Sequence, residues 1–201
     1  MMKPTELKVR LTFLEDVLGT ASSNPEIHEE FIASKAPDAK TVAEEVAAVG
    51  VDEVVEKSMT IFPKNANGQP FLYDYQIRGF FKEACSCLKK VPDTISSKIK
   101  AHKKMIDGSV FVNPRQIVID LHSMKLDNCQ RPLRASTAQG ERISLANSEV
   151  VPAGSTIEFT VVCLVEKDIE AVKEWLEYGI YKGLGQWRNS GKGRFEVEYI
   201  E

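Results

Sequence analysis

The chain has 201 residues, of which 43% are hydrophobic and 27% charged, and it carries a formal net charge of -3 at pH 7. This length and hydrophobic content suffice for a folded core, and they exclude a disulfide-stapled miniprotein and a disordered chain. No apolar run approaches the roughly 20 residues of a membrane helix, and residues 1–4 lack the apolar region of a signal peptide. We expect a globular cytoplasmic protein without a membrane partner.

The charge is distributed unevenly along the chain. Residues 1–60 contain 12 acidic and 6 basic side chains, residues 76–108 contain 8 basic and 3 acidic, and residues 182–194 contain 4 basic and no acidic ones. Contact with a polyanion depends on local charge more than on the total. The two basic segments are therefore candidate phosphate-binding surfaces in a chain that is acidic overall.

The four cysteines include one C-x-C pair and no C-x-x-C pair. That spacing fits neither a structural zinc site nor a thioredoxin-type centre. Acidic pairs on presumed helices are typical of solvated faces, and no G-x-S-x-G motif is present. We expect reduced thiols and no metal or other cofactor.

Hydrophobic periodicity predicts the secondary structure. The elements are a strand at 7–13, a mostly helical acidic insertion at 24–70, helices at 76–88 and 92–106, strands at 110–112 and 116–121, a hairpin insertion at 123–154, a strand at 157–163, a helix at 168–180 and a strand at 195–199. The order predicts an α+β, ferredoxin-like (RRM-like) β-α-β-β-α-β core with an antiparallel sheet. We interpret residues 1–201 as a single domain with two insertions.

The segment 179–194 contains five of the twelve glycines and four cations. Glycine allows a positive φ and close approach of a ligand, and successive backbone N–H groups can form an anion-binding nest. Tyr181 and Trp187 offer faces for base stacking. Neither the P-loop nor the dinucleotide motif is present, since Lys192 precedes a glycine and Gly183-x-Gly185 lacks a third glycine. In the alternative interpretation, the glycines bind no ligand and only allow the backbone conformations that a helix-to-strand connection needs.

At this loop the sequence resembles the RAMP superfamily, the RNA-binding proteins of CRISPR systems that are built on ferredoxin-like domains. The residues that carry the resemblance are Gly183 to Gly193, Leu11–Phe13 with the following Leu18–Thr20, and Tyr75 to Ala84. A component of an antiviral defence complex and a stand-alone relative carried by a phage or other mobile element both fit it.

The resemblance implies RNA, single-stranded or of CRISPR type, held against the sheet and the glycine loop, and it allows a protein partner in a ribonucleoprotein or defence complex. The expected contacts come from the loop, from the first core helix and from the hairpin. They are Gly183, Gly185, Trp187, Arg188, Ser190, Gly191, Lys192, Gly193 and Arg194; Arg78 and Lys82; and Arg131, Arg134 and Arg142.

Three alternatives to a non-catalytic RNA-binding protein remain open. The first is a metal-independent endoribonuclease, with His122 or His102 as the proton carrier. The second is an inhibitor or interaction module that acts on a defence complex, for which the acidic first 60 residues provide a surface. The third is capture of a small phosphorylated ligand, because a phosphate nest serves a nucleotide as well as a polymer.

Overall fold

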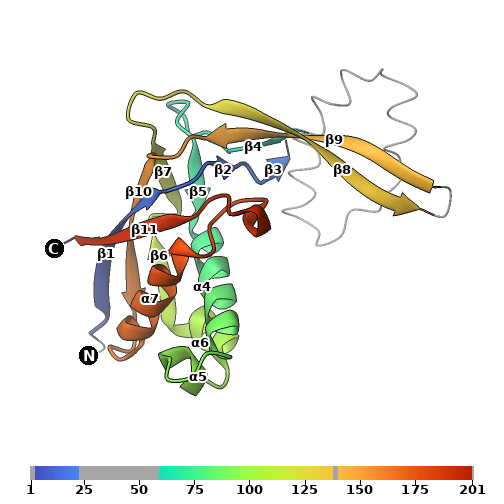
Figure 1. Ribbon diagram of the computed structural model, residues 1–201. Helices are drawn as coiled ribbons and strands as arrows, with labels where there is room; N and C mark the ends of the chain where they lie inside the picture. Colours follow the sequence, from blue (N-terminus) through green and yellow to red (C-terminus); the bar gives the residue numbers. More distant parts are fainter. Residues whose placement is uncertain (1–2, 23–58, 138–139, 201) are drawn as a thin grey trace. The chain divides into compact units, whose positions relative to one another are not determined.

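The computed structural model of the chain describes residues 3–22, 59–137 and 140–200 (Figure 1). The chain divides into two compact units. Met1–Val17, Pro63–Lys125 and Val151–Glu201 form the first unit, and Leu18–Phe62 and Leu126–Val150 form the second.

The first unit is built on a six-stranded sheet in which every pairing is antiparallel. Its strand order is β11-β1-β10-β7-β5, and β6 pairs with β10 alongside β7. The strands are β1 (Thr5–Phe13), β5 (Phe71–Tyr73), β6 (Val110–Asn113), β7 (Gln116–Asp120), β10 (Thr156–Cys163) and β11 (Phe195–Ile200). The first strand lies between the last strand and β10, which is the split β-α-β arrangement of a ferredoxin-like fold. The predicted fold class is confirmed.

Helices cover one face of this sheet, with α4 and α7 side by side (Figure 1). They are α4 (Asp74–Leu88), α5 (Ile95–Lys98), α6 (His102–Ser109) and α7 (Asp168–Glu177). The period-two pattern of β1 places Val9, Leu11 and Phe13 in the core, and the helical stripe of α4 buries Phe80 and Phe81 against it. The opposite face of the sheet is exposed and carries the polar residues of the alternation.

The prediction of one helix at 92–106 is wrong in one respect, because the segment forms two short helices, α5 and α6. Ile99 ends α5 in an extended conformation, with φ -86° and ψ 115°. The Glu174 carboxylate on α7 accepts the N–H groups of Ile95 at 2.5 Å and Ser96 at 3.0 Å, so it supplies acceptors at the start of α5. The start of this helix is therefore stabilised by a local cap, the Thr94 hydroxyl that accepts the Ser97 N–H, and by a carboxylate distant in sequence.

The second unit contains a five-stranded sheet in the order β2-β9-β4-β3, with β8 paired to β9. The strands are β2 (Val17–Leu18), β3 (Ala21–Ser22), β4 (Thr60–Ile61), β8 (Asp127–Thr137) and β9 (Gly140–Val151). The last two form a long antiparallel hairpin that pairs from Asp127↔Val150 to Thr137↔Gly140. This hairpin lies within the segment 123–154, where the sequence predicts a hairpin insertion.

The expected helical insertion at 24–70 lies largely outside the described residues. In its described part, residues 59–70, the backbone forms β4 and a turn. The Asn65 side-chain oxygen accepts the N–H groups of Asn67 and Gln69, each at 3.0 Å, and Gly68 adopts φ 75°. These are the local side-chain bonds that favour a turn over a helix.

Candidate nucleic-acid interface

The glycine-rich loop connects α7 to β11, and two of its glycines allow its two arms to touch. Leu184 donates its N–H to the Gly193 carbonyl at 2.9 Å. A Cβ atom built on Gly183 would lie 1.9 Å from the carbonyl carbon of Gly193, and one on Gly193 would lie 1.9 Å from the Leu184 oxygen. No side chain fits at either position while the arms remain paired.

The backbone N–H groups of Gly191 and Gly193, two of the residues expected to contact RNA, donate hydrogen bonds within the protein. Gly193 donates its N–H to the Asp16 carbonyl at 2.8 Å, and Gly191 donates its N–H to the Arg188 carbonyl at 3.0 Å. Both glycines adopt positive φ, 83° at Gly191 and 72° at Gly193. These two N–H groups stabilise the loop and the neighbouring turn after β1, and while these bonds are in place they cannot donate to an anion.

All four cations of the loop form ion pairs with carboxylates from other elements. Glu83 of α4 contacts both Arg188 and Lys182, the latter at 2.8 Å. The remaining two pairs reach the turn after β1: Lys192 contacts Asp16 at 2.8 Å, and Arg194 contacts Glu15 at 3.0 Å. The pairs tie the loop to α4 and to the end of β1. Each cation nevertheless keeps between 25% and 39% of its side-chain surface exposed.

Two aromatic side chains of the loop face solvent beside these cations. Tyr181 is 72% exposed and Trp187 is 41% exposed. Trp187 also adopts a left-handed backbone conformation, with φ 56°, which is unusual for a residue other than glycine. The fold therefore keeps a large apolar ring at the surface at some cost in backbone strain.

We expect acidification to weaken the attachment of this loop. Burial alone would raise the pKa of Glu83, but hydrogen bonds from Lys182 and Arg188 and their charges hold it below its ordinary value of 4.5. A depressed carboxyl pKa contributes stability above the unfolded-state value, and that contribution is lost as the pH falls through the folded-state value. Thermal melts between pH 6 and pH 3 should show a falling midpoint, and Glu83→Gln should flatten this dependence. An identical slope in the variant would contradict the assignment.

The two second-choice residues on α4 are also paired. Arg78 contacts Asp74 at 3.4 Å, and Lys82 contacts Asp107 at 2.5 Å. Lys82 precedes Glu83 in the chain, but its side chain pairs with Asp107 of α6 and not with a residue of the glycine loop. Arg78 lies further along α4, at the end where Asp74 also binds Arg115 at 2.8 Å.

The hairpin residues lie in the second unit. Arg131 and Arg134 are on β8, and Arg142 is on β9, where it pairs with Ala135. Arg131 is half-buried. The side chains of Arg134 and Arg142 lie outside the described residues. The basic character of this hairpin stays a prediction.

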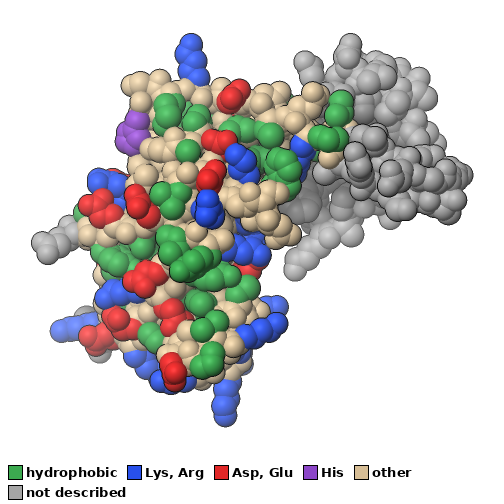
Figure 2. Space-filling view, viewed as in Figure 1, with side chains coloured by type: hydrophobic (Ala, Val, Ile, Leu, Met, Phe, Trp, Pro, Cys, Tyr) green, Lys and Arg blue, Asp and Glu red, His purple; other side chains and the backbone are tan. Residues whose placement is uncertain are grey.

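The exposed face of the first unit's sheet carries carboxylates, which would repel RNA phosphates. Arg10 stands between Glu158, at 2.6 Å, and Glu198, at 3.0 Å. On the face that Figure 2 shows, Lys and Arg side chains alternate with Asp and Glu and form no continuous positive field. A phosphate contact on that face must therefore be local.

One basic cluster has no ion pair with the described residues. It lies around α5 and α6, where the sequence predicts a basic solvent face. We call Lys90, Lys98, Lys100, Lys103 and Lys104 the lysine corner. It provides a matched comparison for the glycine loop, because its charges are similar in number and have no carboxylate partner among the described residues.

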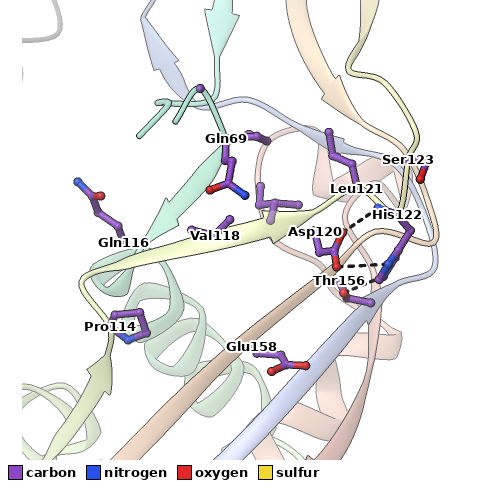
Figure 3. Close-up of a pocket in the computed structure, with 13 residues that line it drawn as sticks. Gln69, Pro114, Gln116, Val118, Asp120, Leu121, His122, Ser123, Thr156 and Glu158 are labelled. Atoms are coloured by element: carbon purple, nitrogen blue, oxygen red, sulfur yellow. Dashed lines mark hydrogen bonds and ion pairs between the residues drawn. The ribbon is translucent and has the colours of Figure 1, made fainter. Parts of the chain in front are cut away.

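His122 lies at a pocket on the exposed face of the sheet, where it contacts two neighbours (Figure 3). Its Nδ1 atom is 3.3 Å from a carboxylate oxygen of Asp120, and its Nε2 atom is 2.9 Å from the hydroxyl of Thr156. A carboxylate that orients an imidazole is thus present. A phosphodiester here would, however, approach the carboxylates of Asp120 and Glu158, which also line the pocket.

His102, the other candidate proton carrier, begins α6 and is partly buried. Desolvation and the nearby charges of Lys89 and Lys103 lower its pKa. Its Nδ1 atom lies 3.4 Å from the Lys89 ammonium. The position is therefore one where a neutral imidazole is favoured.

The part of the chain that the structure describes shows neither a cluster of metal-binding side chains nor a helix that could span a membrane. It contains no group of three or more His, Cys, Asp or Glu side chains able to hold a metal ion. None of its helices has the length and apolar character needed to span a membrane. All four cysteines are free thiols, and burial raises the pKa of Cys163 to about 11.

No protein-family model and no curated protein sequence matches the chain. Solved structures do match, and one of them is described as "Cryo-EM structure of the Type III-B Cmr-beta bound to cognate target RNA". The likeness is one of fold. The matched chain is 14% identical, with a TM-score of 0.52, and the alignment covers 99% of this chain. This chain spans 61% of the length of the matched one.

Proposed function

We propose that this protein binds single-stranded RNA through its glycine-rich loop, as a non-catalytic protein of RAMP type. The observation that carries the proposal is the joint exposure of Tyr181 and Trp187 beside four partly exposed cations. Aromatic faces stack on unpaired bases and cations contact phosphates, which together make a sequence-tolerant site for a single strand.

The ion pairs of the loop are compatible with such a site. Partly exposed pairs of this kind each contribute about 1 kcal/mol or less, because water screens them. An RNA phosphate can therefore replace Glu83, Glu15 or Asp16 as the partner of a loop cation at small cost. The carboxylates hold the cations in place before RNA binds.

The fold supports the same proposal. The solved chain that shares it belongs to a complex described as bound to target RNA. We infer that this chain likewise works within a protein–RNA assembly. The acidic carboxylates near His122 favour binding over cleavage, since they would repel a phosphodiester.

Replacing Arg188, Lys192 and Arg194 together with alanine is expected to weaken binding of a single-stranded RNA by at least tenfold. The variant should neutralise fewer phosphates, so the slope of log affinity against log salt should fall by about 0.7 for each phosphate that is no longer neutralised. Fluorescence anisotropy at several salt concentrations measures both quantities.

The matched control removes three charges from the lysine corner, as Lys98→Gln, Lys103→Gln and Lys104→Gln. A general charge effect would weaken RNA binding equally in the two variants, whereas a local site predicts the larger loss in the loop variant. Circular dichroism confirms that each variant is folded. Equal affinity of the loop variant and the unmodified protein would refute the proposal.

A further inference from the structure

The pocket beside β7 has a volume of about 740 Å³, which suits a ligand the size of a nucleoside or a little larger. We call the apolar part of its lining, the exposed side chains of Pro114 and Val118, the floor; Ile119 also borders the pocket, but its side chain is 2% exposed and faces the core. Figure 3 shows hydrogen-bonding side chains at both ends: Gln116 at one, and Asp120 with His122 at the other. An apolar floor between polar ends suits a ring that bears polar groups on its edge.

The charges of the lining select against a phosphate. The lining contains two carboxylates, Asp120 and Glu158, and no lysine or arginine. A phosphoryl group would meet the two carboxylates here, and the nearby Arg10 guanidinium is already paired with Glu158 and Glu198. Carboxylates do accept hydrogen bonds from ribose hydroxyls, as in dinucleotide-binding sites. The lining therefore suits an uncharged sugar and base better than a nucleotide phosphate.

The backbone at the rim of this pocket is strained, and side chains of neighbouring residues hold it in that conformation. His122 and Ser123 adopt consecutive positive φ values, 47° and 73°, and neither is glycine. Asp120 accepts the His122 N–H at 2.8 Å and contacts its imidazole, while Thr156 contacts the other ring nitrogen. Such strain costs of order 1 kcal/mol or more per residue, and it concentrates at ligand sites. Here it fixes the imidazole at the mouth of the pocket.

We propose that this pocket binds the base and ribose of an uncharged ribonucleoside moiety. The floor formed by Pro114 and Val118 contacts the ring, the Gln116 amide contacts its edge, and the carboxylate of Asp120 accepts from the sugar. Two sources share this chemistry: a nucleotide within a bound RNA strand and a free nucleoside. The inference rests on the proposed function only in naming RNA as one of these sources.

The test uses the full chain, labelled with ¹⁵N, and titrates adenosine, guanosine, cytidine and uridine in turn. We expect at least one nucleoside to shift the amide signals of β7 and of residues 121–123. Gln116→Ala should weaken that binding at least fivefold, whereas Gln130→Ala, an exposed amide on β8, should leave it unchanged. A 5′-monophosphate should bind no more tightly than its nucleoside.

Two further arms separate the sources. Shifts produced by free nucleosides assign a free ligand, and shifts produced by an RNA oligonucleotide alone assign a base within a strand. If the β7 amide signals do not shift in either titration, the inference is overturned. Equal nucleoside affinity of the Gln116→Ala and Gln130→Ala variants overturns it as well. The variant lacking Arg188, Lys192 and Arg194 distinguishes the two proposals. If it keeps full RNA affinity while nucleosides bind the pocket, the proposed function fails and this inference stands.

Discussion

Gly183→Ala is expected to lower the free energy of unfolding by about 3 kcal/mol, because it forces a methyl group into backbone. The added Cβ would lie 1.9 Å from the carbonyl carbon of Gly193 and 2.1 Å from its oxygen. Backbone atoms yield less readily than the end of a side chain. The two arms of the loop must separate, and the hydrogen bond from Leu184 to Gly193 breaks as they do. Urea denaturation followed by circular dichroism measures the effect.

Gly79→Ala is the matched control for this substitution. Gly79 lies inside α4, and a Cβ built on it meets no atom within 4 Å. Alanine is the better helix former, so this variant should gain about 0.5–1 kcal/mol of stability. Opposite signs for the two glycines are expected. Equal denaturation midpoints would show that the loop opens freely and that its glycines are not structurally required.

Trp175→Ala is expected to cost about 3–5 kcal/mol of stability, the range of large aromatic deletions in a core. Trp175 is fully buried on α7 and packs on Phe81 of α4, with 5.7 Å between ring centroids. Its indole N–H donates to the Ser96 hydroxyl at 2.9 Å, which in turn contacts Glu174 at 2.5 Å. The substitution creates a cavity, and it removes the donor that the Ser96 hydroxyl accepts from.

The chain has two tryptophans, so Trp187→Ala provides the comparison. Its ring is 41% exposed, and its removal should change stability by less than about 0.5 kcal/mol. The same change should weaken RNA binding by about 1–3 kcal/mol if a base stacks on the ring. Urea titration and RNA anisotropy on both variants separate the two roles. A Trp187→Ala variant that binds RNA normally would remove stacking on Trp187 from the proposed site.

Several elements were predictable because their patterns are local. Alternation of apolar residues located β1, β10 and β11, and the apolar stripe of α4 matches the residues that the structure buries. The predicted break at Asn113-Pro114 separates β6 from β7. The glycine loop was located by composition alone. The break between α5 and α6 at Ile99 was not predicted, and neither was the Glu174 carboxylate at the start of α5, which is distant in sequence.

The chemistry of the candidate site was only partly predictable. Composition identified the cations of residues 182–194, and it gave no sign that Glu15, Asp16 and Glu83 would pair with them. The sequence likewise singled out His122 without Thr156, which lies 34 residues further along the chain. The D-x-H spacing was the one local signal, since it brings Asp120 close to the imidazole.

The sequence by itself determined the ferredoxin-like order of elements and the position of a glycine-rich, basic loop, because hydrophobic period and glycine content are properties of neighbouring residues. The tertiary structure alone decided how the net charge of -3 is arranged at that loop. Folding brings α4 and the end of β1 against it, so each cation meets a carboxylate more than 90 residues away in the chain. Coulomb interactions depend on distance in space, and a linear sequence does not contain that distance.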